Sequence, residues 1–299
     1  MNKIIVSGSS ARALALKVSK LSGVDYVEVQ TKKFPDNEKY VRILGDVEGK
    51  TVFVIQSMGR APDEYLLEYF LLVDALKDLG AKKVIGLIPY FAYARQDQRF
   101  KPGEALSIKT VSRLIEFVGT DKLYTIDCHR HRVKEAEFRE LVKIPVVDLS
   151  AMPLLAEYIK KNYELENPIV MGPDAEAIEW ARKAAEVFNC EYDVLEKKRI
   201  SEREVEIKPR KLDVNGRDVV IVDDIISTGG TMVEAIKVIK KEGARKVIVA
   251  CTHPILVEDA LAKIYATGVF DVIGTDTVPS PISVVSVAPL LAEVVKSEQ

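Results

Sequence analysis

Short, continuous apolar runs recur along the chain, and segments with helical periodicity separate them. The runs are rich in Val and Ile and end at Gly, Pro, Asp or Ser, which is typical of strands buried on both faces of a parallel sheet. Eight runs fit this description: 3–8, 50–57, 82–90, 122–127, 167–174, 218–224, 245–253 and 271–276. Stretches such as 62–81 and 175–188 instead repeat apolar residues at the helical period. The alternation predicts an α/β fold with mostly parallel sheets flanked by helices.

Two stretches of the sequence share one plan, which suggests two related domains. Residues 74–93 and 235–256 both run from a helix through Gly-Ala and two basic residues into an apolar strand. The length of 299 residues also favours two domains of about 150 residues. We expect an N-terminal domain of 1–148 and a C-terminal domain of 149–283, with a last helix in 284–299 that packs back on the first domain.

The stretch 219–231 combines an apolar strand, two adjacent carboxylates and a glycine turn that opens a helix. Gly229 and Gly230 allow a tight turn, whose N–H groups form a phosphate site together with the positive end of the helix dipole. Asp223 and Asp224 would repel a phosphate, so sugar hydroxyls or a metal ion are their expected partners. The pattern predicts a phosphorylated sugar as ligand, and a capped strand–loop–helix corner without a ligand is the alternative.

Composition narrows the class of protein. The formal net charge of -2 argues against general nucleic-acid binding, and no apolar run of about 18 residues is available to span a membrane. The three cysteines are widely spaced and odd in number, which fits free thiols in a reducing compartment. With no signal core at its start, the chain is expected to be cytoplasmic and to bind neither nucleic acid nor membranes.

Residues 219–231, VVIVDDIISTGGT, resemble the phosphoribosyl-pyrophosphate loop that phosphoribosyltransferases share with ribose-phosphate pyrophosphokinases. The resemblance implies that the turn binds the 5-phosphate of ribose 5-phosphate, while the two carboxylates accept hydrogen bonds from the ring hydroxyls. The implied ribose 5-phosphate residues are Asp223, Asp224, Ser227, Thr228, Gly229, Gly230 and Thr231. Ser227 stands where the pyrophosphokinases usually carry a third Asp, and this position alone favours the transferases.

Motifs in the N-terminal half resemble ATP-binding elements of the pyrophosphokinases. Residues 34–38, FPDNE, resemble a Phe-Pro-Asp-Gly-Glu loop that reaches into a neighbouring subunit's ATP site, and Asn37 can keep a left-handed backbone at the Gly position. Residues 93–97 are similar to a Tyr-Ala-Arg-Gln-Asp segment, and Arg at a strand end suits polyphosphate. A polar turn and a solvated loop are the alternatives. The implied ATP-binding residues are Phe34, Asp36, Asn37, Glu38, Arg95, Gln96 and Asp97.

Two segments carry implied metal ligands. Residues 125–132, TIDCHRHR, resemble the family's Asp-Leu-His-Ala segment, which implies that His129 helps to hold Mg²⁺ on the ATP side. Asp174 matches a metal-linked carboxylate of the family. Glu176 and Ala177 replace the Gly-Gly that follows it there, so the shape of this loop stays open.

Lys197 and Arg199 match the Lys-x-Arg pattern of the family's mobile catalytic loop, for which a charge-rich hairpin is the alternative. Seven motifs, ending with 251–254, occur in the family's order across nearly the whole chain. The resemblance therefore implies two phosphoribosyltransferase-like domains and a homo-oligomer with a dimer as its building unit. It also implies transfer of the pyrophosphoryl group of ATP to ribose 5-phosphate. A phosphoribosyltransferase and a non-catalytic relative of the synthetase are the alternatives.

Overall fold

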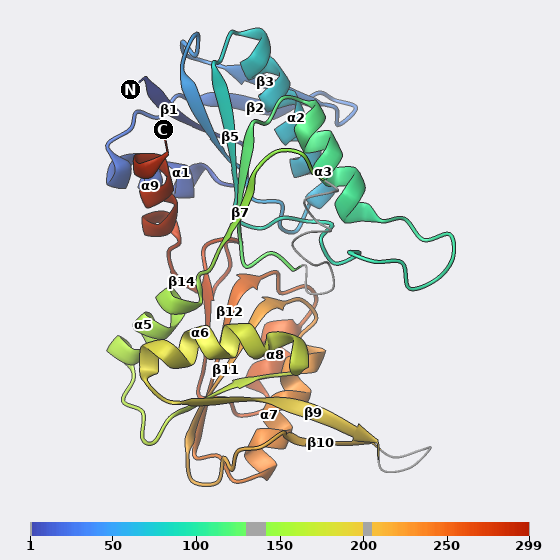
Figure 1. The fold of residues 1–299 in the computed structure, drawn as a ribbon, viewed down its shortest axis with the longest axis vertical. Helices are drawn as coiled ribbons and strands as arrows, with labels where there is room; N and C mark the ends of the chain where they lie inside the picture. Colours follow the sequence, from blue (N-terminus) through green and yellow to red (C-terminus); the bar gives the residue numbers. More distant parts are fainter. Residues whose placement is uncertain (1, 130–141, 200–204, 299) are drawn as a thin grey trace. The chain divides into compact units, whose positions relative to one another are not determined.

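The computed structural model describes residues 2–129, 142–199 and 205–298, without the side chains of residues 197–199 and 205–207. The chain forms two compact units, Met1–Leu149 with Ser286–Gln299 and Ser150–Val285. Each unit is built on a mostly parallel sheet with helices on both faces (Figure 1), which confirms the predicted α/β fold. In the part of the chain described, no helix is both long and apolar enough to cross a membrane.

The first unit contains a five-stranded parallel sheet in the order β1-β4-β5-β6-β7. Its strands are β1 (Lys3–Ser7), β4 (Thr51–Ile55), β5 (Lys83–Ile88), β6 (Lys122–Ile126) and β7 (Val146–Leu149). The strands β2 (Val29–Lys33) and β3 (Lys39–Ile43) form a separate antiparallel hairpin. Before this hairpin, Tyr26 makes a parallel bridge to Ile5 of β1. Tyr26 therefore stands in for a strand on the outer side of β1, opposite β4.

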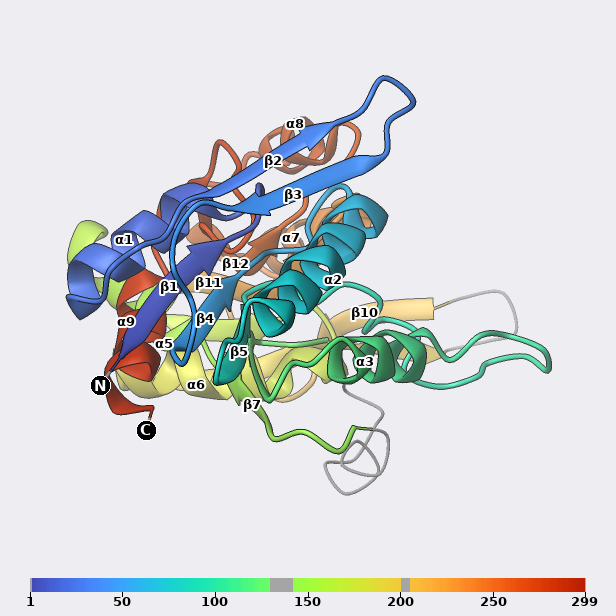
Figure 2. The ribbon, with the colours of Figure 1, turned by 90° about the horizontal axis from the view of Figure 1, so that it is seen from above.

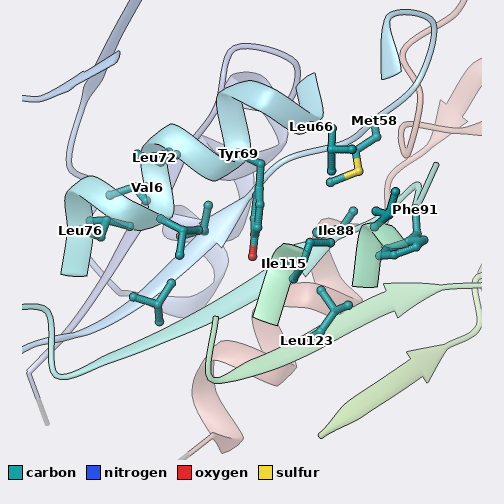
Figure 3. Packing of buried hydrophobic residues seen from close by; sticks show 14 of the residues in the cluster. Val6, Met58, Leu66, Tyr69, Leu72, Leu76, Ile88, Phe91, Ile115 and Leu123 are labelled. Carbon is teal, nitrogen blue, oxygen red and sulfur yellow. The ribbon is translucent and has the colours of Figure 1, made fainter. Parts of the chain in front are cut away.

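Helices cover both faces of this sheet. On one face lie α2 (Pro62–Asp78) and α3 (Ser107–Phe117), and on the other lie α1 (Arg12–Ser22) and α9 (Ala288–Ser297), which pack together (Figure 2). Tyr69 projects from α2 into the core (Figure 3), and its hydroxyl lies 2.9 Å from Thr120 Oγ1. An added Cβ at Gly86 would lie 2.4 Å from the Tyr69 hydroxyl, so the glycine in β5 makes room for this ring.

The second unit contains a seven-stranded sheet in the order β10-β9-β8-β11-β12-β13-β14, in which β10 is antiparallel to β9. Its strands are β8 (Ile169–Gly172), β9 (Glu191–Arg199), β10 (Val205–Pro209), β11 (Asp218–Ile226), β12 (Lys246–Pro254), β13 (Asp271–Thr275) and β14 (Ser283–Val285). One face is covered by α5 (Met152–Asn162) and α6 (Ile178–Phe188), the other by α7 (Gly230–Lys241) and α8 (Ala260–Tyr265).

The apolar run 219–222 in β11 shows why the continuous pattern predicts a strand. Val219 and Ile221 pack with the core under α7 and α8, whereas Val220 and Val222 pack with the core under α5 and α6. Since both faces of β11 are covered, the side chains that point to either face of the strand are apolar in this run. The prediction of a strand buried on both faces is confirmed.

Each sheet has a point where the chain connections leave in opposite directions. In the second unit this switch point lies between β8 and β11, because β8 leads outward to β9 while β11 leads to β12. In the first unit it lies between β1 and β4, because β1 leads outward to Tyr26 while β4 leads to β5. Ligands of open α/β sheets bind outside the carboxyl ends of the strands at such points. The loops after these four strands are therefore the first places to look for a site.

Candidate functional site

Two adjacent carboxylates lie at the carboxyl end of β11. Asp223 lies opposite Cys251 of β12, and its Oδ1 accepts a hydrogen bond from Asp224 N–H at 3.0 Å. Asp224 is buried and Asp223 is half-buried. Burial raises the pKa of Asp223 well above its usual range, and the nearby carboxylates of Asp224 and Asp174 raise it further. Crowded carboxyls of this kind favour hydrogen-bond donors or a cation as neighbours.

The turn after β11 leaves the N-terminus of α7 open. Gly229 precedes the helix with a φ of 78° and, as a glycine, has no side chain that could cap the first turn. An added Cβ at Gly229 would lie 3.2 Å from the Ala260 carbonyl oxygen, so both backbone and packing require this glycine. At Gly230 an added Cβ would meet no atom of the described chain within 4 Å. A glycine there keeps the helix N-terminus accessible to a bound anion.

Hydroxyl groups surround this turn. Thr228 and Thr231 are exposed, whereas Ser227 is half-buried and its carbonyl oxygen accepts a hydrogen bond from Val257 N–H at 3.2 Å. The turn therefore combines hydroxyl donors, open N–H groups and a helix dipole, which together suit a phosphate.

Asp174 follows β8, on the other side of the switch point. Its Oδ1 accepts a hydrogen bond from Glu176 N–H at 2.9 Å and caps the 3-10 turn η1 (Ala175–Ala177). The loop thus has a compact shape without the family's Gly-Gly. Packing instead requires Gly172, because an added Cβ would lie 2.8 Å from the Ala177 Cβ. The second unit therefore brings Asp174, Asp223 and the turn 227–231 to one edge of its sheet.

The segment 34–38 forms the exposed tip of the β2–β3 hairpin. Phe34 N–H donates to the Glu38 carbonyl and Asn37 N–H donates to the Phe34 carbonyl, each at 2.9 Å. Asp36 Oδ1 accepts from Glu38 N–H at 3.2 Å. Asn37 has a φ of 73°, which confirms the left-handed backbone expected at this position. Phe34 is 44% exposed, so the tip offers an aromatic ring and carboxylates to another molecule.

The loop after β5 folds around Glu104. Its Oε2 accepts hydrogen bonds from Gln96 Nε2 at 3.0 Å, from Phe100 N–H at 2.8 Å and from Lys101 N–H at 3.0 Å. Arg95 is exposed, Gln96 is half-buried and Asp97 is buried. The motif residues 95–97 therefore have different surroundings, and Glu104, which no motif identifies, holds Gln96 in place.

His129 follows β6 and is half-buried. Asp148 of β7 shapes this strand exit, because its carboxylate accepts from the Thr125 hydroxyl at 2.6 Å and from Cys128 N–H at 3.1 Å. Asp127 has a φ of 40° in the same exit. Two further non-glycine residues with positive φ, Arg60 at 66° and Tyr93 at 65°, follow β4 and β5. Backbone strain gathered at one edge of a sheet is a mark of functional loops.

Lys197 and Arg199 lie at the end of β9, in register with Ile207 and Val205 of β10. Their side chains fall outside the described residues. Over the ranges that the structure describes, no three His, Cys, Asp or Glu side chains are grouped as a metal site. Of the implied metal ligands, His129 belongs to the first unit and Asp174 to the second.

Comparison with known proteins decides the family. A family model described as the N-terminal domain of ribose phosphate pyrophosphokinase matches residues 3–119, and a phosphoribosyl transferase domain model matches residues 139–284. The ribose-phosphate pyrophosphokinase of Methanothermobacter thermautotrophicus is 46% identical and covers 98% of this chain and 100% of its own length. The chain belongs to the ribose-phosphate pyrophosphokinase family.

Other members of the ribose-phosphate pyrophosphokinase family agree with this assignment. The Methanopyrus kandleri enzyme is 41% identical over 98% of this chain and 99% of its own length. The crystal structure of phosphoribosylpyrophosphate synthetase from Mycobacterium smegmatis has a TM-score of 0.88 and 30% identity, covering 99% of this chain and 98% of that chain. The family resemblance inferred from the motifs is confirmed, and so are the two phosphoribosyltransferase-like domains and the assignment to an enzyme family.

Proposed function

We propose that this chain transfers the pyrophosphoryl group of ATP to the C1 hydroxyl of ribose 5-phosphate, giving 5-phosphoribosyl 1-pyrophosphate and AMP. The observation that carries the proposal is the pairing of an open helix N-terminus with crowded carboxylates at one switch point. A sugar phosphate satisfies both groups at once, through its phosphate and its hydroxyls. Family membership supports ATP as the second substrate.

We assign ribose 5-phosphate to the second unit. The N–H groups and hydroxyls of 227–231 bind the 5-phosphate, in keeping with the accessible start of α7. Asp223 and Asp224 accept hydrogen bonds from the ring hydroxyls. These bonds would favour the ionised carboxylates and so offset the effect of burial on Asp223.

We assign ATP to the first unit. Arg95, Gln96 and Asp97 contact the nucleotide from the loop after β5, where Glu104 fixes the Gln96 amide. The exposed tip 34–38 completes the adenine site of a neighbouring copy, with Phe34 stacking and Asp36, Asn37 and Glu38 hydrogen bonding. This assignment requires a homo-oligomer, with a dimer as its building unit.

The reaction needs positioning and charge neutralisation more than covalent catalysis. The C1 oxygen forms a bond to the β-phosphorus of ATP as it loses its proton, and the bond from that phosphorus to the α–β bridging oxygen breaks, so AMP leaves. Lys197 and Arg199 neutralise charge on the transferred group. His129 in the first unit and Asp174 in the second would each be a ligand for Mg²⁺, and the crowded carboxylates beside Asp174 suit a cation. Bound Mg²⁺ would neutralise phosphate charge.

The test is AMP formation from ATP that depends strictly on ribose 5-phosphate, followed by chromatography with the purified protein. A phosphoribosyltransferase would form no AMP from these substrates, but would consume 5-phosphoribosyl 1-pyrophosphate when a nucleobase is added. A non-catalytic relative would do neither. Either of these results would overturn the proposal.

A further inference from the structure

A buried carboxylate of the protein itself fills the switch point of the first unit. Glu68 of α2 is 0% exposed. Its Oε1 accepts hydrogen bonds from Ser9 N–H at 2.5 Å and from Gln56 Nε2 at 3.0 Å, and its Oε2 accepts one from Ser9 Oγ at 2.8 Å. Ser9 follows β1 and Gln56 follows β4, so Glu68 joins the loops of the two strands that flank this point.

The remaining partner of Glu68 comes from the β2–β3 hairpin. Lys39 Nζ lies 2.7 Å from Glu68 Oε2 and 2.7 Å from Glu64 Oε1, and the Lys39 side chain is 8% exposed. Lys39 is the first residue after the tip 34–38 and lies in register with Lys33 on the other strand. Lys33 Nζ lies 2.7 Å from Glu64 Oε2, but its side chain is 44% exposed. Three ion pairs thus attach the hairpin to α2 at the base of its tip: the buried pair Lys39–Glu68, and the pairs that Lys39 and Lys33 each make with Glu64.

The buried pair Lys39–Glu68 and the exposed pair Lys33–Glu64 differ in their expected effect. An exposed pair such as Lys33–Glu64 contributes little, because water and salt screen it. A buried pair costs desolvation that its attraction barely repays, so we expect Lys39–Glu68 to contribute to the position of the hairpin more than to stability. Ser9 and Gln56 already satisfy both Glu68 oxygens, so the loops alone do not require Lys39. The hairpin is a two-stranded sheet of its own, and its position therefore depends on contacts with α2 such as this pair.

We propose that Glu68 and Lys39 are positioning residues that set where the 34–38 tip projects, and thereby control the affinity for ATP. The inference rests on the proposed function, in which this tip completes an ATP site. Neither side chain is assigned a contact with substrate. The expected effect of disrupting the pair is therefore on the KM for ATP, through a displaced tip, and not on the KM for ribose 5-phosphate.

The central variant is the double replacement Lys39→Met with Glu68→Gln, which removes both charges but keeps similar volumes. Replacing Lys39 alone would leave a buried carboxylate with three neutral donors and could unfold the hairpin, so the double variant is the safer test. Lys33→Met is the matched control, because it removes the exposed ion pair from the opposite strand. Lys39→Arg keeps the charge and tests for rescue, and Phe34→Ala reports whether the tip itself contributes to ATP binding.

In initial-rate assays at saturating partner substrate, the double variant should raise the KM for ATP by about 5- to 20-fold, with kcat changed less. The KM for ribose 5-phosphate and the melting temperature should stay close to wild type, and Lys33→Met and Lys39→Arg should behave like wild type. If the KM for ATP is unchanged in the double variant but raised in Phe34→Ala, the positioning role of Glu68 and Lys39 is overturned, whereas the proposed function is not. Equal rises in both KM values with a lower melting temperature would show a structural role only. An unchanged KM for ATP in Phe34→Ala would overturn the assignment of the tip to ATP.

Discussion

Glu298 holds the C-terminal helix α9 on the first unit, and replacing it should loosen that helix. Its Oε1 lies 3.2 Å from Lys83 Nζ, and its Oε2 accepts hydrogen bonds from Lys122 Nζ at 2.9 Å and from the Tyr124 hydroxyl at 2.5 Å. The Glu298 side chain is 9% exposed, so these contacts are shielded from solvent. The perturbation is Glu298→Gln, which keeps the shape of the side chain and removes its charge.

The pKa of Glu298 sets the size of the expected effect. Burial alone would raise this pKa, but hydrogen bonds from Tyr124, Lys122 and Lys83 lower it from 4.5 to about 2. At about 1.4 kcal/mol per pKa unit, the lowering corresponds to roughly 3 kcal/mol in favour of the docked helix. A carboxylate whose pKa is lower in the folded state than in the unfolded state stabilises the fold at a pH above its pKa in the unfolded state. This stabilisation is lost as the pH falls through the pKa of the folded state. The contribution of Glu298 should therefore be full above about pH 5.5 and fade from pH 4.5 toward pH 2.

Hydrogen exchange of the α9 amides, followed by mass spectrometry, measures this docking directly. At pH 7 we expect Glu298→Gln to lower protection of residues 288–297 by about 30–150-fold, which corresponds to roughly 2–3 kcal/mol. Glu293 is exposed on the same helix, so Glu293→Gln is the matched control and should retain wild-type protection.

The pH dependence separates charge from shape. After correction for intrinsic exchange rates, more than half of the free-energy difference between wild type and Glu298→Gln should be lost by about pH 3. Wild-type protection of α9 in Glu298→Gln at pH 7 would refute the reasoning. A difference that stays constant down to pH 3 would also refute it, because the effect would then not come from the ionised carboxylate.

Three further predictions concern the site. Asp223→Asn or Asp224→Asn should raise the KM for ribose 5-phosphate far more than that for ATP, by roughly 1.5–3 kcal/mol per charged hydrogen bond lost, and equal losses in initial-rate assays would contradict the assignment. Lys197→Ala and Arg199→Ala should each lower kcat by about 10²–10⁴-fold with smaller changes in KM. A near-normal kcat with a steeply raised KM for ATP would instead make them ground-state ligands. Glu104→Gln should raise the KM for ATP by about 3- to 10-fold and leave that for ribose 5-phosphate unchanged, because Gln96 and the backbone of 100–101 lose a charged acceptor. A wild-type KM for ATP in this variant would show that the Gln96 amide needs no such support.

Eight strands of the two sheets could be predicted from their apolar runs, whereas the short edge strands β7 and β14 could not. All eight apolar runs contain a strand, because covered faces leave a continuous apolar signal. The short strands β7 and β14 lie at the edges of their sheets, and their patterns mix polar and exposed residues. In β7, for example, Val147 and Asp148 are both exposed, so the segment 146–149 has no buried periodicity to detect.

In the candidate site and its surroundings, residues with local spacing could be predicted from the sequence, whereas residues that depend on distant contacts could not. Motifs identified residues whose spacing is local, such as the strand and turn 219–231. They did not identify Glu68, whose contacts with Ser9, Lys39 and Gln56 span 59, 29 and 12 positions of the chain. The available signal was a carboxylate among the apolar positions of the helical stretch 62–81, beside Tyr69 and one turn before Leu72. Such a signal indicates a buried partner but cannot say which residue supplies it.

The two units use equivalent switch points for different purposes. In the second unit, α7 starts at a glycine that offers no capping side chain, and the carboxylates of Asp223 and Asp224 crowd each other, so both features suit an external ligand. In the first unit, the N–H and hydroxyl of Ser9 donate to the Glu68 carboxylate, so a carboxylate of the protein itself takes up these donors. The fold alone does not distinguish the two crevices. The two switch points differ in a few side chains, because Glu68 joins the loops of one to a hairpin, whereas Asp223 and Asp224 crowd each other at the other.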